Sequence, residues 1–169
     1  MASSGSDLTL RSSRTRGLLI GVVVLVGALA LAIWQGQHPS PLPTSTRTVS
    51  VSTPVDEAVY VGVANGIDGR LLHLSGVKVQ TTSNTDVSVT PLLCRDGRIE
   101  ATTAPETFCS ELVNPEGQEL RAGDSVILQV LSDEPAVAVI DPVRLGFREG
   151  LQWGTFPTGA SAVVRVLSR

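Results

Sequence analysis

The sequence predicts an all-β protein in which one transmembrane α-helix precedes an antiparallel β-sandwich. Three observations predict this fold class. An apolar run fills residues 17–34, the segments after residue 55 alternate apolar and polar side chains, and turn residues such as Asn65-Gly66 and Asp68-Gly69 separate those segments. Strands do not alternate with long helical segments, which argues against an α/β fold.

Residues 17–34 form the predicted membrane span. These eighteen residues contain no charged side chain, and as a helix they would extend about 27 Å, close to the hydrocarbon thickness of a bilayer. Three arginines lie among residues 1–16, and the next charge is Arg47. Because positively charged flanks stay in the cytoplasm, we expect residues 1–16 to be a cytoplasmic tail. The lipid bilayer is then the partner of residues 17–34, and the C-terminal part lies outside the cell membrane.

A cleaved signal peptide is the alternative for the same run. Ala28-Leu29-Ala30 and Ala30-Leu31-Ala32 offer small residues at the spacing of a cleavage site. Signal peptides turn polar after about 7–15 apolar residues, whereas this run continues through Ile33 and Trp34. The length favours a retained anchor, with Trp34 at the outer interface.

Residues 35–54 have the composition of a stalk. They contain four prolines with serines and threonines between them. Proline disfavours helix and favours the extended polyproline II conformation. The sequence therefore predicts a stalk over residues 35–54 and one extracytoplasmic domain over residues 55–169.

Nine short segments of this domain have the alternation or the β-branched content of strands. Turn residues separate them at nearly regular spacing, which is typical of a sandwich or a barrel. The predicted strand segments are 58–64, 71–80, 86–95, 98–103, 120–131, 136–141, 143–148, 151–155 and 161–167.

Four local features refine this prediction. Gly76 marks a bulge in its strand, and Pro91 marks an edge position or a bulge. Asp96-Gly97 predicts a hairpin turn that joins the strand segments on either side of it. Residues 103–112 predict one short helical turn, because Thr103 and Glu106 have the spacing of a capping box.

The layout resembles a known class of protein. An arginine-flanked single span, a Pro/Thr-rich stalk and one acidic β-domain resemble the single-pass cell-envelope proteins of high-GC Gram-positive bacteria. The phrase LRAGDSVILQV, residues 120–130, resembles the turn-and-strand phrases of Ig-like sandwiches. Antibody domains place a tryptophan between two cysteines, whereas Trp34 and Trp153 both lie outside the interval from Cys94 to Cys109. The resemblance therefore implies an Ig-like layout of the ectodomain and carries over no site residue.

Cys94 and Cys109 are the only cysteines of the chain. The outward topology places them in an oxidising compartment, where a bridge would stabilise the domain by about 3 kcal/mol through loop closure. A redox pair would have Cys-x-x-Cys spacing, and a zinc site would need further ligands nearby. We therefore expect a structural disulfide, with no metal and no cofactor.

The domain lacks the residue patterns of common catalytic sites. His73 is its single histidine, no Gly-x-Ser-x-Gly turn occurs, and alternation with Leu72 and Leu74 places His73 on the solvent face. The adjacent pairs Asp56-Glu57 and Asp133-Glu134 cannot act together from a regular strand, because neighbours point to opposite faces. No catalytic residue is predicted, and a carboxylate pair assembled by the fold stays open as an alternative.

Phe147, Trp153 and Phe156 bring most of the domain's aromatic residues into one segment, residues 145–159. Exposed, they would form a contact patch for a glycan or a protein. Buried, they would fill the sandwich core. The domain has few other aromatic residues, so the core interpretation is favoured and the contact patch stays open.

Charge and motifs together predict a binding role rather than catalysis. Residues 55–169 contain fifteen acidic and nine basic residues, so they lack the basic surface that phosphate backbones require, and nucleic acid is not an expected partner. We expect a non-catalytic interaction or structural module of the cell envelope, whose partner is an envelope protein or glycan. The alternatives are an extracytoplasmic carbohydrate-active enzyme with a fold-assembled carboxylate pair, and a ligand-sensing ectodomain.

Overall fold

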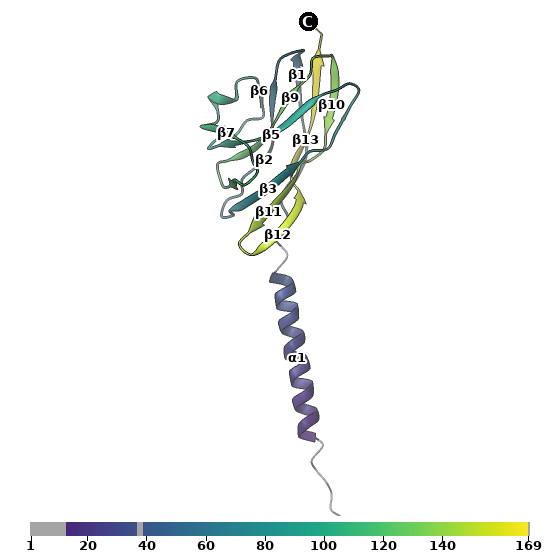
Figure 1. Ribbon diagram of the computed structural model, residues 1–169, viewed down its shortest axis with the longest axis vertical. Helices are drawn as coiled ribbons and strands as arrows, with labels where there is room; N and C mark the ends of the chain where they lie inside the picture. Colours follow the sequence, from purple (N-terminus) through teal and green to yellow (C-terminus); the bar gives the residue numbers. More distant parts are fainter. Residues whose placement is uncertain (1–12, 37–38, 169) are drawn as a thin grey trace, which may run out of the picture. The chain divides into compact units, whose positions relative to one another are not determined.

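The computed structural model describes residues 13–36 and 39–168 of the chain. The chain divides into two compact units, Met1–His38 and Pro39–Arg169. The first unit holds the helix α1 (Ser13–Gly36), and the second unit holds the described strands (Figure 1).

Helix α1 covers the apolar segment 17–34 and adds a few residues at each end. Every residue from Ile20 to Leu31 is exposed. Within the described part of the chain, no helix is long and apolar enough to cross a membrane. Residues 1–12 of the predicted cytoplasmic tail and residues 37–38 of the predicted stalk lie outside the described residues.

The second unit confirms the prediction of an all-β domain. Among its described residues, the only helix is the short 3-10 helix η1 (Pro105–Thr107). Each of the nine predicted segments contains a strand. The strands are β1 (Thr44–Pro54), β2 (Val59–Asn65), β3 (Leu72–Lys78), β4 (Thr81–Ser83), β5 (Ser88–Arg95), β6 (Ala101–Thr102), β7 (Glu111–Val113), β8 (Glu119–Leu120), β9 (Ser125–Leu131), β10 (Ala136–Ile140), β11 (Arg144–Glu149), β12 (Gln152–Pro157) and β13 (Gly159–Leu167).

The strands form three hydrogen-bonded sheets. Their orders are β1-β13-β10-β4, β12-β11-β3-β8 and β6-β2-β9-β5-β7. All strand pairs are antiparallel except β1 and β13, which run parallel. An Ig sandwich has two sheets, so the domain is sandwich-like but divides its strands differently. The parallel pair consists of the first and last strands. Parallel strands are not joined by a tight turn, so no local turn residues predict this pairing.

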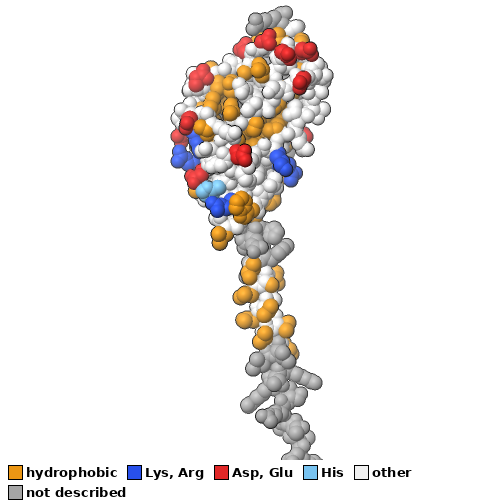
Figure 2. Space-filling model, viewed as in Figure 1, with side chains coloured by type: hydrophobic (Ala, Val, Ile, Leu, Met, Phe, Trp, Pro, Cys, Tyr) orange, Lys and Arg blue, Asp and Glu red, His pale blue; other side chains and the backbone are white. Residues whose placement is uncertain are grey.

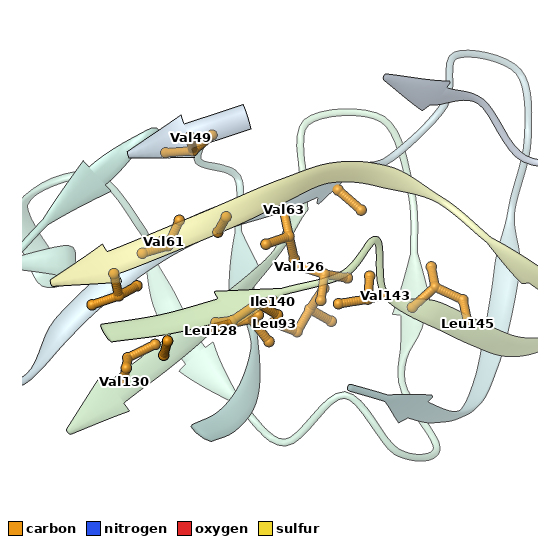
Figure 3. Packing of buried hydrophobic residues seen from close by; sticks show 14 of the residues in the cluster. Val49, Val61, Val63, Leu93, Val126, Leu128, Val130, Ile140, Val143 and Leu145 are labelled. Carbon is orange, nitrogen blue, oxygen red and sulfur yellow. The ribbon is translucent and has the colours of Figure 1, made fainter. Parts of the chain in front are cut away.

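The core follows the predicted alternation. Val59, Val61 and Val63 of β2 are buried, and the residues between them are half-buried. Figure 3 shows Leu93 of β5 and Ile140 of β10 among the buried side chains of one apolar cluster. Side chains from all three sheets enter this cluster, which holds the sheets together as one domain.

The predicted stalk is wrong for residues 44–54, which form β1. This strand pairs with β13 from Thr48 to Pro54. Val49 and Thr53 are buried, so the segment has the period of a strand with one face inward. The proline-rich residues before Thr44 precede the strand rather than interrupt it. The domain therefore begins at Pro39 and not at residue 55.

The hairpin predicted at Asp96-Gly97 does not form. β5 pairs with β9 and β7, whereas β6 pairs with β2. The chain does turn here, because Asp96 has a positive φ of 48°, but the turn leads away from β5. A Cβ on Gly97 would lie 2.1 Å from the carbonyl oxygen of Phe108. Glycine is therefore needed for close backbone approach rather than for a two-residue hairpin.

Two other local predictions are confirmed. The pairing of β3 with β11 shifts register at Gly76, where Ser75 is the additional residue of a bulge. Pro91 lies in the part of β5 that pairs with β9 alone, because β7 pairs only from Leu93 onward. Its missing N–H therefore costs no hydrogen bond to a second strand.

The predicted helical turn is η1, but the predicted capping box is wrong. Ala104 is the N-cap residue and η1 has no side-chain cap. Two nearby threonines hydrogen-bond to the backbone of Ala104 instead. Thr102 Oγ1 accepts a hydrogen bond from the Ala104 N–H at 3.1 Å, and Thr107 Oγ1 donates one to the Ala104 carbonyl at 2.8 Å. These bonds hold the turn in place of the expected Thr103–Glu106 exchange.

Candidate functional site

The predicted disulfide between Cys94 and Cys109 is confirmed. Cys94 lies in β5 and Cys109 follows η1, so the bridge fastens the intervening loop to the five-stranded sheet. Both residues are buried and pack with Ile127 in a small second apolar cluster. Such a buried bridge stabilises the fold and offers no accessible sulfur for exchange.

The hairpin of β11 and β12 divides the three predicted aromatic residues between core and solvent. Phe147 is buried, with its ring centre 6.2 Å from that of the half-buried Phe156, whereas Trp153 is 65% exposed. The register explains this division, because Phe147 stands opposite Gly154 on the inner face and Trp153 stands opposite Arg148 on the outer face. A contact patch that includes Phe147 is therefore wrong. Trp153 remains exposed, with the Arg148 guanidinium 5.6 Å from its ring centre.

Arg70 joins this hairpin to the start of the domain. Its guanidinium donates two hydrogen bonds to Glu149, at 2.9 and 2.6 Å, and further bonds to the carbonyls of Ser40 at 3.1 Å and Pro41 at 3.4 Å. The hydrogen bonds from Arg70 hold the pKa of Glu149 below its ordinary value, against the opposing effect of burial. The segment at Ser40 is therefore clamped to the hairpin by a bidentate ion pair.

The fold also brings carboxylates together, as the enzyme alternative requires. Asp56, Asp86 and Asp133 line one shallow depression at the end of the domain where β9 finishes. Neither adjacent acidic pair acts as a unit, since Glu57 and Glu134 do not line this depression. Within the described residues, no group of three or more histidine, cysteine or acidic side chains could hold a metal ion.

His73 lies in β3 with about two fifths of its side chain exposed, as its alternation with leucines predicts. Its Nδ1 is 3.5 Å from a carboxylate oxygen of Glu119 on the neighbouring strand β8. The histidine therefore makes a surface pair with Glu119.

One buried carboxylate was not predicted from the sequence. Asp124 has no exposed surface and accepts hydrogen bonds from Arg95 at 2.7 Å and from the backbone N–H of Asp96 at 3.0 Å. Arg95 also donates to the side chain of Gln118 at 2.7 Å. The network ties the end of β5 to the turn before β9, which makes Asp124 structural. Its position directly after Ala122-Gly123 was the available signal, because Asp in a Gly-containing turn often accepts backbone bonds.

A second candidate binding site is a groove beside β1, called here the β1 groove. It has a volume of about 480 Å³. It opens where β1 leaves its partner: Thr44 pairs with Gly159 and Thr48 pairs with Ser161, so three residues of β1 oppose one residue of β13. The lining residues are Pro43, Thr44, Ser45, Arg47, Val49, Gly62, Val63, Ala64, Asn65, Gly66, Ile67, Ile99, Glu100, Thr158, Gly159 and Ala160.

Glycines bring the backbones around this groove unusually close. A Cβ on Gly62 would lie 1.9 Å from the carbonyl oxygen of Ile99, and one on Gly159 would lie 1.7 Å from that of Val63. Gly159 also has a positive φ of 75°, which L side chains rarely adopt. The groove thus has a backbone-lined floor that only glycine permits at these two points.

The chemistry of the β1 groove suits binding rather than catalysis. Its titratable side chains are Arg47 and Glu100, which form an exposed ion pair across the rim. Thr158 donates its hydroxyl to the Pro43 carbonyl at 3.0 Å and is therefore committed to the fold. The lining otherwise offers small apolar side chains, hydroxyl groups and backbone. The described lining can hold an extended chain through its backbone groups and hydroxyls.

Comparison with known protein families, curated proteins and solved structures gives no match for this chain.

Proposed function

We propose that this protein is a membrane-anchored, extracytoplasmic interaction module of the cell envelope. The module binds an extended polypeptide segment of an envelope protein in the β1 groove and along β1. One observation carries the binding proposal: β1 is the terminal strand of its sheet, and the groove opens at its bulge. An open strand edge presents unpaired N–H and C=O groups that a partner strand can bind.

The length and composition of β1 favour this mode of binding. The strand has 11 residues, about twice the common length. Its exposed side chains are mainly serine and threonine, which hydrogen-bond to a partner without steric obstruction. The charged Arg47, which would oppose indiscriminate pairing, lies at the bulge and pairs with Glu100. The edge next to the groove is therefore open to a strand of suitable sequence.

The proposed location has two supports. The apolar residues 17–34 with arginines before them have the pattern of a retained anchor whose C-terminal side faces outward. The Cys94–Cys109 disulfide is typical of an oxidising compartment outside the cytoplasm. An Ig-like layout of the domain is part of the same proposal. Its support is the sandwich-like packing of antiparallel strands, and the three-sheet arrangement is a departure from that layout.

Site-directed photocrosslinking in intact envelopes tests the binding proposal. A photoreactive amino acid replaces Ser50, an exposed position on the open edge of β1, or Glu116, an exposed turn residue used as the control. We expect a discrete crosslinked protein from position 50 and none from position 116. The same pattern at both positions, or no product from position 50, would contradict the proposal.

A variant that fills the β1 groove tests whether the crosslinked partner binds there. Ser45→Trp places a large side chain at the mouth of the β1 groove, where Ser45 is exposed and lies in the bulge. We expect Ser45→Trp to abolish the crosslink from position 50, whereas Glu116→Trp leaves it intact. Unfolding curves of both variants verify that the lost crosslink reflects a blocked groove rather than a disrupted domain.

Protease treatment of intact cells with the wall removed tests the location. We expect the domain from residue 39 onward to be digested from outside while a short N-terminal fragment stays with the membrane through alkaline carbonate washing. Release of the intact domain into the medium would indicate a cleaved signal peptide. Protection of the domain would place it in the cytoplasm.

The acidic depression supports one alternative function, a carbohydrate-active enzyme. Asp56, Asp86 and Asp133 line the same depression, and glycoside hydrolysis uses two carboxylates on opposite sides of the bond. Hydrolysis of dye-labelled cell-wall glycan that is lost in both Asp86→Asn and Asp133→Asn would favour this alternative. Absence of hydrolysis by the unmodified chain would reject it.

A further inference from the structure

We propose that the end of the β11–β12 hairpin is a lipid-contact surface that seats the domain on an anionic membrane. This surface, called here the tip patch, consists of Leu71, Arg148, Leu151 and Trp153. The proposal rests on the membrane anchor proposed above and adds a second membrane contact that the anchor does not itself require.

The tip patch is the most exposed apolar part of the domain. Leu151 is 94% exposed, Trp153 65% and Leu71 43%. Leu151 occupies the two-residue turn between Glu149 and Gln152, next to Gly150 with its positive φ of 60°. The pairing of His73 with Arg148 sets Leu71 two positions farther toward the same turn. Exposed apolar side chains gathered in one place, rather than scattered singly, are characteristic of surfaces that contact a protein or a membrane.

The residue types match a lipid interface. Tryptophan prefers the headgroup region, where its ring is partly apolar and its N–H stays hydrated. The Arg148 guanidinium lies over the Trp153 ring, and none of the carboxylates in the described part of the chain forms an ion pair with it. Arg148 is thus a positive charge available to anionic headgroups, beside apolar side chains that can insert between them.

The charge distribution of the domain orients this surface. Figure 2 shows basic and apolar side chains meeting at the end of the domain where β11 and β12 turn, and acidic side chains gathered at the opposite end. Asp56, Asp86 and Asp133 share a depression near Leu167, because the Val55 N–H donates to the Leu167 carbonyl, and Figure 1 marks the C-terminus at that opposite end. An anionic membrane attracts the first end and repels the second.

The β11–β12 hairpin, which carries most of the tip patch, contacts the first residues of the domain. Only Gln37 and His38 separate Gly36 from Pro39 in the sequence. Pro39 is buried, and a Cβ on Gly154 of β12 would lie 2.6 Å from its Cγ. Arg70 holds the next residues, through Ser40, to Glu149 at the end of β11. The hairpin is therefore packed against the first residues of the domain, which follow the apolar segment in the sequence.

Two single-tryptophan variants of the full chain test the proposal, because Trp34 and Trp153 are the only tryptophans. Trp34→Phe leaves Trp153 to report on the tip patch, and Trp153→Phe leaves Trp34 to report on the anchor. Each variant is reconstituted into phosphatidylcholine vesicles with and without phosphatidylglycerol. Lipids brominated at shallow or deep positions of the acyl chain serve as quenchers.

We expect the emission of Trp153 to shift to shorter wavelength and to be quenched most by shallow bromines, with stronger quenching when phosphatidylglycerol is present. In the Trp34→Phe chain, Leu151→Ser and Arg148→Gln should each weaken this quenching. Val137→Ser is the matched control, since Val137 is an exposed apolar residue of β10 outside the tip patch, and it should leave the quenching unchanged.

The two reporters separate the two proposals. Quenching of Trp34 together with solvent-like emission from Trp153 would overturn the lipid contact and leave the anchor standing. Quenching of Trp153 without Trp34 would overturn the anchor while supporting the tip patch as a lipid surface. A shift of Trp153 to shorter wavelength without quenching by bromine would show that protein covers the patch, and would also overturn the lipid contact.

Discussion

Arg95 donates a hydrogen bond of 2.7 Å to Asp124, a carboxylate with no exposed surface, and so links the end of β5 to the turn that begins β9. Both strands belong to the five-stranded sheet, and the Cys94–Cys109 bridge starts from the residue next to Arg95. A buried ion pair and a covalent crosslink thus meet at one end of the sheet. The stability of this end depends on polar contacts as well as on apolar burial.

Replacement of the buried carboxylate should be strongly destabilising. Asp124→Asn keeps the shape of the side chain but leaves Arg95, whose side chain is 16% exposed, without its counter-charge. We expect a loss of about 3 kcal/mol in the free energy of unfolding, measured by urea denaturation of the full chain in detergent. Asp96→Asn is the control, because Asp96 is 62% exposed and adopts a positive φ that asparagine tolerates. It should change stability by less than about 1 kcal/mol, and equal losses in both variants would contradict the structural role of Asp124.

Reduction of the disulfide should lower stability without abolishing the fold. The bridge closes a loop with a sequence separation of 15 residues, for which loop-closure entropy gives about 3 kcal/mol. We expect the denaturation midpoint of the native chain to fall when a reductant is added, and that of Cys94→Ala/Cys109→Ala to be unaffected by reductant. Because both sulfurs are buried, reduction should be slow unless denaturant is present. A midpoint that does not change on full reduction would rule out a stabilising bridge.

The pair between Arg70 and Glu149 should make stability depend on pH. The hydrogen bonds from Arg70 lower the pKa of Glu149 below its ordinary value of 4.5, so the unfolded chain binds this proton first as the pH falls. The contribution of this ion pair to the free energy of unfolding is complete above pH 4.5. It is lost as the pH falls through the lowered pKa of Glu149 in the folded state. Glu149→Gln should therefore cost roughly 1 kcal/mol at neutral pH, and less in more acidic solution.

Unfolding curves of the native chain and Glu149→Gln at neutral and acidic pH measure this difference. Exposed Glu116→Gln serves as the control for removal of one carboxylate. A difference between the native chain and Glu149→Gln that stays constant down to strongly acidic pH would contradict the ion pair as its cause.

Local periodicity predicted the strands that carry their own signal. Three strands, β2, β9 and β10, have valines at alternate positions, in β9 together with other apolar residues. The structure contains these strands in the predicted segments. Gly76 and Pro91 were interpretable because a bulge and an unpaired edge are local consequences of these residue types. The disulfide followed from composition and topology alone, since the chain has only two cysteines.

The misplaced elements are those that depend on distant partners. Residues 44–54 have a strand period in Val49, Val51 and Thr53, but the proline-rich residues before them dominated the interpretation as a stalk. Their partner is β13, more than a hundred residues away in sequence, and that pairing leaves no local mark. The turn at Asp96-Gly97 failed for the same reason, because long-range packing against Phe108 decides its course.

The candidate site was beyond prediction because four separate parts of the chain build it. The β1 groove draws on residues 43–49, 62–67, 99–100 and 158–160, and none of them carries a motif. Trp153 illustrates the opposite case. The sequence identified the aromatic segment, but only the register of β11 with β12 determines that Phe147 faces inward and Trp153 outward.

The close backbone contact at Gly159, in the floor of the β1 groove, predicts that alanine at this position is destabilising. Gly159→Ala would place a Cβ 1.7 Å from the Val63 carbonyl oxygen, at a φ of 75°. Gly69 has the same φ, yet a Cβ there would meet no atom within 4 Å. Gly69→Ala therefore measures the cost of the backbone conformation alone, about 1 kcal/mol, and we expect Gly159→Ala to cost about 3 kcal/mol because β13 must also move away from β2. Urea denaturation compares the two variants, and hydrogen exchange of the β1 and β13 amides should rise only in Gly159→Ala. Equal costs would mean that the backbones at the groove floor are not in close contact.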